Sequence, residues 1–249
     1  MRARRDPRPR PPAVADDWAL FLDVDGCLLD FAAAPDAVVV PESLPRLLDD
    51  LVQRLDGALA LVSGRALVDI DRLFAPLEVP AVGLHGLQRR GAAAVTPPPA
   101  LAAILAEAAP VVAAYPGALV EDKGVAMALH WRTAPSAAAA LRSFAEAAVP
   151  RLPGYRLQHG NQVVELRPAD GDKGAAIRAL LDEPPFRGRV PVFAGDDLTD
   201  ESGFAVVNAR GGLSVLVGGR EPSAAHYALH DPAAVRAWLG GNHHRKAMP

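Results

Sequence analysis

The sequence has few of the features that mark secreted, membrane-spanning or nucleic-acid-binding proteins. Its single cysteine, Cys27, excludes an internal disulfide framework and agrees with a reducing cytoplasm. No apolar stretch is long enough to span a bilayer. The formal net charge is -3, so there is no general basic field to hold nucleic acid or an anionic membrane. We therefore expect a cytoplasmic protein that needs no nucleic acid, no membrane and no obligate protein partner.

Both ends of the chain lack the pattern of a packed element. Residues 1–15 are basic and rich in proline, without the apolar middle of a secretory signal, so we expect a disordered tail. A nucleic-acid-binding arm is the alternative, but this segment has no interleaved aromatic residues and precedes an acidic body. Residues 242–249 are expected to form a second tail, in which His243 and His244 belong to a solvated end and not to a metal site.

The body of the chain has enough apolar residues for one large or two small domains, at 249 residues and 50% hydrophobic. Short apolar runs alternate with helical patterns in its first and last thirds, which predicts a Rossmann-like α/β core with a parallel sheet. The predicted strands cover residues 18–22, 58–62, 81–84, 190–193 and 213–217, and the predicted helices cover 44–55, 67–74, 173–181, 201–207 and 233–239.

The middle of the chain follows a different pattern. Two alanine-rich helices, up to residue 115 and over 136–149, are each followed by paired short strands around a turn, which is typical of a small α+β unit. We therefore predict one core built from residues 16–88 and 168–241, with an inserted domain at 89–167.

Two aspartates stand where the first predicted strand runs into a loop. Asp23 and Asp25 follow the apolar run 18–22 and precede Gly26. Residues i and i+2 of a strand share a face, so their carboxylates repel unless a cation or the chemistry of an anionic substrate uses them. This arrangement favours a site for phosphoryl transfer.

Polar residues also follow or precede other core elements. In open parallel sheets the ligand lies beyond the carboxyl ends of the strands, so these residues are expected to converge. Together with the aspartate pair they make four groups along the chain. The other three are Ser63-Gly64-Arg65, Asp172-Lys173-Gly174 and the acidic stretch Gly195–Glu201.

The four groups match what phosphoryl transfer from an ester requires. A carboxylate can attack phosphorus and hold it as an acyl phosphate, a role that fits Asp23. A second carboxyl, Asp25, would protonate the leaving oxygen and later take a proton from water. Ser63 would hydrogen-bond a phosphoryl oxygen, and Lys173 would neutralise the charge of the transferred group.

A magnesium ion is expected among the same carboxylates. Mg²⁺ prefers a few oxygen ligands, which Asp23, the backbone carbonyl of Asp25 and Asp196 would supply. Asp197 and Asp200 would orient Lys173 and metal-bound water, or cap a helix.

Each group taken alone also has a purely structural explanation. An Asp-x-Asp-Gly loop can be a plain turn, Ser63 can cap the next helix, and acids after residue 195 suit a helix N-terminus. A lysine that opens a helix, such as Lys173, is ordinarily a solvated charge. Four such groups in this order at predicted strand ends are much harder to obtain by accident.

The core residues resemble a known superfamily. Asp23-x-Asp25, Ser63, Lys173 and Gly195-Asp-Asp197 are similar to the four motifs of the haloacid dehalogenase phosphatases, which implies a Mg²⁺-dependent aspartyl-phosphate route. From about Trp18 to Leu239 the chain resembles, more narrowly, trehalose-6-phosphate phosphatases of the bacterial OtsB type. The segments that carry this resemblance are Gly57–Arg65, Gly83–Gly86, Ala126–Arg132, Val163–Pro168 and Gly195–Phe204.

The resemblance implies that the insertion is a cap that closes over a sugar phosphate and excludes water. Glu165 is the first candidate for sugar binding, because an acid is unusual in an apolar strand unless it faces a ligand. His130 and Arg132 could instead face water, and His85 and Arg65 could merely fasten turns, although Arg65 is well placed near an anion. The implied substrate-binding residues are Gly64, Arg65, Glu121, Lys123, His130, Arg132 and Glu165.

The resemblance implies hydrolysis of trehalose 6-phosphate to trehalose and phosphate. Alternatives are hydrolysis of sucrose phosphate or mannosyl-3-phosphoglycerate, a phosphosugar mutase, or a sugar-phosphate sensor without turnover. The chain departs from the superfamily pattern at Cys27, where threonine is usual after the glycine. We expect activity to survive this change, because Cys27 is not one of the catalytic acids.

Overall fold

The structure, a computed structural model, describes residues 8–32, 37–93 and 95–241. The expected tail at residues 242–249 therefore lies outside the described residues, as do residues 1–7. Within the described ranges, no helix is both long enough and apolar enough to cross a membrane.

The chain divides into two compact units. The core unit comprises Met1–Gly91 and Asp172–Pro249, and the insert unit comprises Ala92–Gly171. The sequence pattern places the two division points after residues 88 and 167. In the structure they lie slightly later, after Gly91 and Gly171. The reason is local, because residues 88–89 still pair with a core strand and the last insert strand ends only at Pro168.

The core unit has a seven-stranded sheet in the order β11-β10-β9-β1-β2-β3-β4. Its strands pair in parallel except for β4, which is antiparallel to β3. This confirms the predicted α/β class with a mostly parallel sheet. The strands are β1 (Trp18–Leu22), β2 (Leu59–Val62), β3 (Ala81–Gly83), β4 (Gln88–Arg89), β9 (Val190–Gly195), β10 (Leu213–Val217) and β11 (Tyr227–Leu229).

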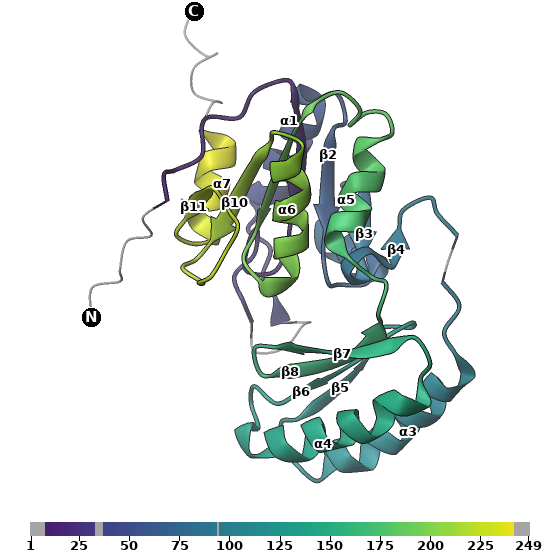
Figure 1. Cartoon of the computed structure of the whole chain (residues 1–249). Coiled ribbons are helices and arrows are strands. Elements are labelled where there is room, and N and C mark those ends of the chain that lie inside the picture. The colour runs from purple at the N-terminus through teal and green to yellow at the C-terminus, as the bar shows by residue number, and fades with distance from the viewer. Residues whose placement is uncertain (1–7, 33–36, 94, 242–249) are drawn as a thin grey trace, which may run out of the picture. The chain divides into compact units, whose positions relative to one another are not determined.

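Helices cover both faces of this sheet (Figure 1). α5 and α6 pack side by side on one face, and α1 and α7 contact each other on the opposite face. The α-helices among the described residues of the core unit are α1 (Ser43–Arg54), α2 (Leu67–Phe74), α5 (Lys173–Leu181), α6 (Glu201–Ala209) and α7 (Pro232–Gly240).

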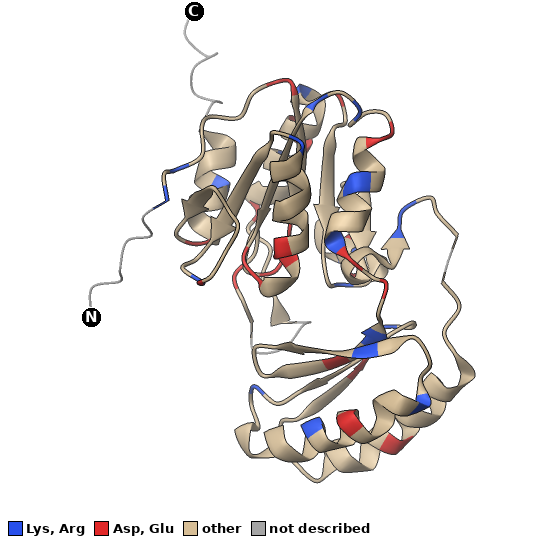
Figure 2. Ribbon diagram, viewed as in Figure 1, with Lys and Arg blue, Asp and Glu red and all other residues tan. Residues whose placement is uncertain are grey.

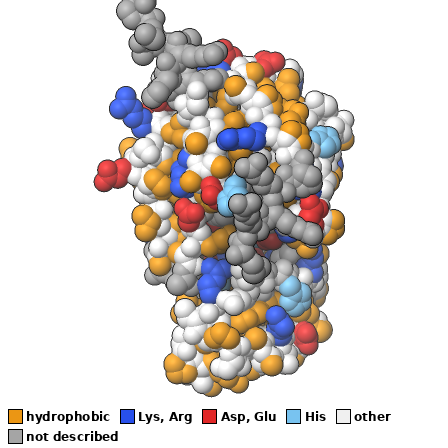
Figure 3. Space-filling view, turned by 90° about the vertical axis from the view of Figure 1, so that its left-hand side faces the viewer, with side chains coloured by type: hydrophobic (Ala, Val, Ile, Leu, Met, Phe, Trp, Pro, Cys, Tyr) orange, Lys and Arg blue, Asp and Glu red, His pale blue; other side chains and the backbone are white. Residues whose placement is uncertain are grey.

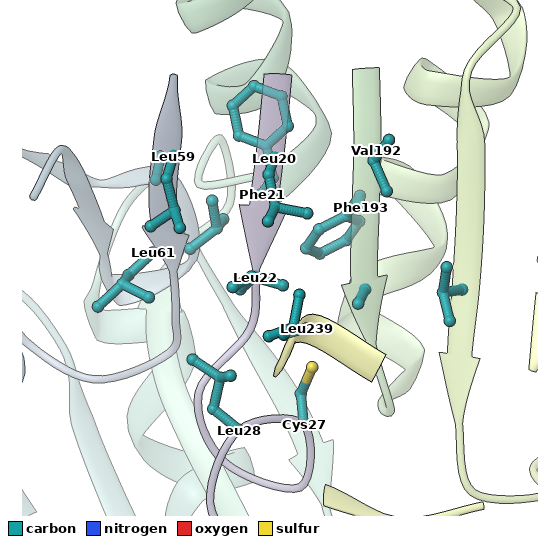
Figure 4. Packing of buried hydrophobic residues seen from close by; sticks show 14 of the residues in the cluster. Leu20, Phe21, Leu22, Cys27, Leu28, Leu59, Leu61, Val192, Phe193 and Leu239 are labelled. Carbon is teal, nitrogen blue, oxygen red and sulfur yellow. The ribbon is translucent and has the colours of Figure 1, made fainter. Parts of the chain in front are cut away.

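The central strand β1 is buried along its whole length. A strand in a parallel sheet covered by helices on both faces must be apolar on both faces, which explains its continuous apolar run. Leu22, Leu239 of α7 and Cys27 belong to one buried cluster, part of which Figure 4 shows. Cys27 is fully buried in this cluster, and burial raises the pKa of its thiol. Its small apolar side chain therefore serves packing under the loop that follows β1.

The connections diverge at the middle of the sheet. From β1 the chain proceeds through α1 to β2 on one side, whereas from β9 it proceeds through α6 to β10 on the other. The carboxyl ends of β1 and β9 therefore lie next to each other at a topological switch point, the place where open α/β sheets bind ligands. Figure 2 shows acidic residues gathered on the loops at this end of the core strands.

The insert unit has the order helix, hairpin, helix, hairpin that the sequence predicts. Its four strands are all antiparallel, in the order β5-β6-β8-β7, and apolar side chains of the strands pack against the two helices. The elements are α3 (Pro99–Ala113), β5 (Leu119–Asp122), β6 (Met127–His130), α4 (Ala138–Ala148), β7 (Tyr155–Gly160) and β8 (Val163–Pro168).

The prediction of a disordered N-terminal tail is wrong for residues 8–15, which pack against the core unit. Arg8 donates to the carbonyl of Ala225 at 3.0 Å, and the Pro12 carbonyl accepts from the indole nitrogen of Trp238 at 2.7 Å. Val14 is buried in the core cluster. Prolines fix their own backbone angle, so ordering this segment costs less entropy than its polar composition indicates.

Charged side chains are mixed in sign on the face seen in Figure 3, where acidic and basic groups lie among apolar ones. Within the core unit, several arginines pair with acids of the same unit, as in Arg54–Asp16, Arg189–Asp56 and Arg236–Asp30. Local pairing of this kind matches a chain whose positive and negative charges nearly balance.

Candidate functional site

Three predicted groups meet at the carboxyl ends of the central strands. Asp23 follows β1 directly, and its amide donates to the carbonyl of Ala194 in β9 at 2.9 Å. Asp196 follows β9, and Ser63 follows β2. Parallel pairing in register brings these residues to one edge although they are far apart in the sequence.

Lys173 lies between two carboxylates in the interior of the core unit. Its Nζ is 3.0 Å from Oδ1 of Asp23 and 2.6 Å from Oδ1 of Asp200. The lysine side chain is only 2% exposed, so the structural alternative of a solvated charge at a helix start is wrong. Asp172 holds this helix start, because its side chain accepts from the amide of Gly174 at 2.9 Å.

Asp200 fixes the loop after β9. Its Oδ1 accepts from Lys173, and its Oδ2 accepts from the amides of Asp196 and Asp197, both at 2.9 Å. Asp197 caps the short 3₁₀ helix η5 (Leu198–Asp200). Both oxygens of Asp200 are thus used within the protein, which supports the predicted role of orienting Lys173 and leaves metal binding to other groups.

Burial and charge shift the ionisation of this cluster. Burial raises the pKa of Asp23 from 3.8 to about 7, although the ammonium of Lys173 offsets part of the effect. Burial and the negative charge of Asp23 raise the pKa of Asp196 to about 9. Burial opposes the charge on Lys173, but Asp200 and Asp23 outweigh it and raise the pKa of this lysine above its usual value. A second cation would bring both aspartates back to their charged forms.

The residues around Asp196 fit a divalent cation. Oxygens of Asp23, Asp196 and Asp200 lie within 4.8 Å of one another. Among the described residues, no hydrogen-bond partner reaches the buried Oδ1 of Asp196. Gly26, with φ of +77°, leaves room for this carboxylate, since a Cβ there would lie 2.3 Å from its Oδ2. Because Asp200 is engaged elsewhere, Asp23 and Asp196 are the carboxylates that could hold the ion.

Asp25 lies apart from the carboxylate cluster. Both of its carboxylate oxygens accept from Arg65, at 2.7 Å from Nε and 2.7 Å from a terminal nitrogen. The prediction placed only the backbone carbonyl of Asp25 on the metal, so its side chain is available for another role. Arg65, predicted to bind substrate, is in this structure the partner of Asp25.

The segment Leu84–Gly86 supports the turn that carries Ser63, a function that sequence reasoning left open. The ring of His85 lies against Gly64, where a Cβ would come within 2.6 Å of its Cε1 and Nε2. The amide of His85 donates to the carbonyl of Ser63 at 2.9 Å. The signal in the sequence is the spacing Gly83-Leu-His-Gly86, with glycines on both sides of the histidine.

The predicted sugar-binding residues of the insert unit are brought together on its four-stranded sheet. Strand register aligns Glu121 of β5, Ala128 of β6 and Glu165 of β8 in one row. Their neighbours in sequence, Val120 and Val164, pack on the helices instead. Because side chains of a strand alternate between faces, the acidic row lies on the face opposite the helices.

Charged groups in this row pair with one another. Glu121 lies 2.8 Å from Nε2 of His130, and Glu165 lies 3.3 Å from Nζ of Lys123. Burial opposes the charge on Glu121, but His130 and Lys123 lower the pKa of this carboxyl below its usual value. Arg132 lies beyond the end of β6 and donates to the carbonyl of Asn161 at 3.4 Å. The alternative in which His130 simply faces water is wrong, because the His130 side chain is half-buried against Glu121.

Comparisons with known proteins point to one family. The family model described as trehalose-phosphatase matches residues 21–233. A probable trehalose-phosphate phosphatase of Sinorhizobium fredii is 48% identical over 214 residues, which cover 84% of this chain and 81% of that protein. A trehalose-6-phosphate phosphatase of Escherichia coli is 44% identical over 239 residues, 94% of this chain and 90% of that protein. A solved structure described as a trehalose-6-phosphate phosphatase related protein has a TM-score of 0.71 at 26% identity, covering 89% of this chain and 95% of its own.

We expect replacement of Gly26 by alanine to displace the Asp196 carboxylate. The new Cβ would lie 2.3 Å from Oδ2 of Asp196, and the left-handed backbone would cost about 1–2 kcal/mol more for alanine than for glycine. The matched control is Gly124→Ala, which has the same φ of +77° and nothing within 4 Å. Thermal unfolding with and without a divalent cation is the measurement. Gly26→Ala should lose the cation-induced rise in Tm, and Gly124→Ala should keep it. Equal cation responses in the two variants would contradict this account of Gly26.

We expect the metal-free protein to lose stability as pH rises. Asp23 and Asp196 have raised pKa values, so between about pH 4 and pH 9 the folded state holds protons that the unfolded state has released. The free energy of unfolding therefore falls with pH, and between about pH 7 and pH 8 the fall comes from Asp196, below the range in which the Cys27 thiol, whose pKa burial raises in the folded state, ionises in the unfolded chain. We expect a loss on the order of 1 kcal/mol per pH unit there. Urea unfolding in EDTA measures it. Asp196→Asn should flatten this part of the curve, and an unchanged slope would refute the assignment.

Proposed function

Because the chain belongs to the trehalose-phosphatase family, we propose that it hydrolyses trehalose 6-phosphate to trehalose and phosphate. This makes it a phosphoric monoester hydrolase. One observation of the structure supports the reaction most directly, namely that Lys173 joins Asp23 and Asp200 in the interior beside Asp196. A nucleophilic carboxylate, a buried cation and a second carboxylate for a metal thus occupy one end of the sheet.

The proposed cofactor is Mg²⁺, held by Asp23, Asp196 and the backbone carbonyl of Asp25. Oxygen ligands of this kind suit a small hard cation that keeps several waters. Bound there, the ion would supply positive charge that stabilises the charge of the transferred group. The buried Oδ1 of Asp196 and its raised pKa support this position for the ion.

The proposed reaction has two steps, both carried by residues of the core unit. In the first, a carboxylate oxygen of Asp23 bonds to phosphorus, the bond from phosphorus to the sugar oxygen breaks, and Asp25 gives its proton to that oxygen. In the second, Asp25 takes a proton from water, whose oxygen bonds to phosphorus and releases Asp23 as a carboxylate. Ser63 binds a phosphoryl oxygen, and Lys173 reduces the repulsion between Asp23 and the substrate.

The proposed sugar site is the polar row of the insert unit. Carboxylates and basic groups that alternate on one sheet face can accept from and donate to neighbouring hydroxyls of a sugar. Glu121, Lys123, His130, Arg132 and Glu165 supply these groups, and strand register places the two glutamates on either side of Ala128. Selection among sugar phosphates would then depend on this unit, and the phosphoryl chemistry on the core.

The proposed activity is tested by measuring phosphate release from a panel of sugar phosphates. The panel holds trehalose 6-phosphate, sucrose 6-phosphate, mannosyl-3-phosphoglycerate and glucose 6-phosphate, with Mg²⁺ and after addition of EDTA. We expect kcat/KM to be highest for trehalose 6-phosphate and activity to vanish in EDTA. Asp23→Asn should reduce turnover by at least about 1,000-fold while Tm stays close to the wild-type value or rises, because loss of the nucleophile removes the covalent route.

A preference for another sugar phosphate would reject the substrate and keep the reaction class. A wild-type protein that binds trehalose 6-phosphate but releases no phosphate would instead identify a sensor.

Glu165 is expected to affect the sugar and not the chemistry. Glu165→Gln removes a charged acceptor, and a hydrogen bond to a charged group contributes about 1.5–3 kcal/mol, or roughly 10- to 150-fold in kcat/KM. We expect that loss with trehalose 6-phosphate and little change with p-nitrophenyl phosphate, which lacks the sugar. Glu107→Gln is the control, because Glu107 lies on α3 of the same unit in an exposed pair with Arg151. Equal losses on both substrates would remove Glu165 from sugar recognition.

A further inference from the structure

The interaction between Arg65 and Asp25 has a geometry that fixes the direction of the carboxyl group. Nε and one terminal nitrogen of the guanidinium each lie 2.7 Å from a different oxygen of Asp25. Paired contacts of this kind set the plane of the carboxyl as well as its position. The arginine side chain is 10% exposed and that of Asp25 29% exposed, so the pair is largely shielded from water.

Arg65 is itself held at both ends of its backbone. Its amide donates to Oγ of Ser63 at 3.2 Å, and its carbonyl accepts from the amide of Leu84 at 2.8 Å. Gly83 contributes by lacking a side chain, since a Cβ there would lie 2.8 Å from the same carbonyl oxygen. The guanidinium therefore starts from a fixed backbone and not from a mobile loop.

The segment that holds Arg65 has an unusual backbone. Leu84 and His85 have φ of +49° and +55°, and both are non-glycine residues in the left-handed region. The left-handed conformation is unfavourable for residues with a Cβ, so two in succession persist only where surrounding contacts require them. Here the contacts are the two backbone hydrogen bonds to the turn of Ser63 and Arg65 and the packing of the His85 ring on Gly64.

We propose that Arg65 is a positioning residue for proton transfer by Asp25, and that the left-handed segment Leu84–His85 keeps Arg65 in place. The proposal rests on the proposed function, because it assigns Asp25 as the acid of that reaction. When one oxygen of Asp25 carries the proton, the guanidinium can keep its bond to the other oxygen and hold the O–H toward the substrate. The proton then passes to the sugar oxygen as its bond to phosphorus breaks, and Asp25 returns to the carboxylate seen against Arg65.

The chemistry of the leaving group separates this role from substrate binding. The sugar oxygen of an alkyl phosphate leaves as a strongly basic alkoxide unless it is protonated, whereas p-nitrophenolate is a weak base and leaves without a proton. A residue that acts through the acid Asp25 therefore matters for the sugar phosphate and hardly for p-nitrophenyl phosphate. A residue that binds the phosphoryl group matters equally for both.

The test is single-turnover kinetics of Arg65→Met and Arg65→Lys on trehalose 6-phosphate and p-nitrophenyl phosphate. Single-turnover release of trehalose or p-nitrophenol reports the first step apart from later hydrolysis of the phosphoenzyme. We expect Arg65→Met to slow trehalose release by about 100-fold, the lower range for general acid catalysis, and p-nitrophenol release by less than about 3-fold. Arg65→Lys keeps the charge but not the paired contact, so it should recover part of the loss.

Two further variants guard against a merely structural effect. His85→Asn tolerates the left-handed backbone but lacks the ring that covers Gly64, and it should show the same selective loss at about 3- to 10-fold. Arg72→Met, at an exposed pair with Asp69, should leave both rates unchanged. The Mg²⁺-induced rise in Tm should persist in the Arg65 variants, because neither carboxylate proposed as a metal ligand is touched.

Several results would overturn the proposal. Equal slowing on both substrates would make Arg65 a ligand of the phosphoryl group, and a higher KM at unchanged single-turnover rate would make it a binding residue. Faster release from trehalose 6-phosphate would mean that Arg65 restrains Asp25 instead of orienting it. If the wild type prefers another alkyl phosphate, the same comparison is made with that ester. A wild type without any phosphatase activity refutes the proposed function, whereas an active wild type with equal losses refutes this inference alone.

Discussion

The site depends on one buried charge, the ammonium of Lys173. Asp23, Asp196 and Asp200 lie close together at the end of the central strands. Burial raises the pKa of Asp23 and Asp196, so their charged forms need compensating positive charge. Lys173 compensates two of the three through direct contacts at 3.0 and 2.6 Å. Leaving a buried charge unpaired costs far more than such a pair gains, so loss of Lys173 would leave Asp23 and Asp200 as uncompensated buried acids. The charge left uncompensated is that of Asp196, the position at which a second cation fits.

The topology makes this crowding possible. Asp23 and Asp196 follow adjacent parallel strands at the same end of the sheet. Lys173 is the first residue of α5, which packs on one face of that sheet. Short loops then suffice to bring side chains from distant parts of the chain within hydrogen-bond distance. Asp200 is as important to this arrangement as the proposed catalytic groups, because its two oxygens join Lys173 to the amides of the loop after β9. The fold and the reaction centre thus rely on the same hydrogen bonds.

The sequence predicts the parts of this arrangement that a local pattern encodes. Apolar runs and helical periodicity placed β1, β10, α2 and α5 at their observed residues, and motif order identified the carboxylates and Lys173. The features that the sequence pattern does not reveal are those that depend on contacts between distant parts of the chain. β4 and β11 are too short to carry a period, and residues 8–15 are ordered only by the core surface against which they pack. The partner of Arg65 belongs to the same class, since an arginine after a serine and a glycine gives no sign of whether it will meet a phosphate or Asp25.

The acidic residues of the two units differ in how far their charges are compensated. In the core unit the acids are shielded from water and short of compensating charge, which suits groups that must attack, bind a cation or move a proton. In the insert unit, Glu121 is paired with His130 and Glu165 with Lys123, so the charges of these acids are already compensated. Their remaining acceptor sites can receive hydrogen bonds from neutral hydroxyls. Under the proposed function, a neutral sugar carrying one charged phosphate would use both environments. Changes in the polar row of the insert unit would then alter which sugar is accepted, while the groups proposed to break the ester bond stay as they are.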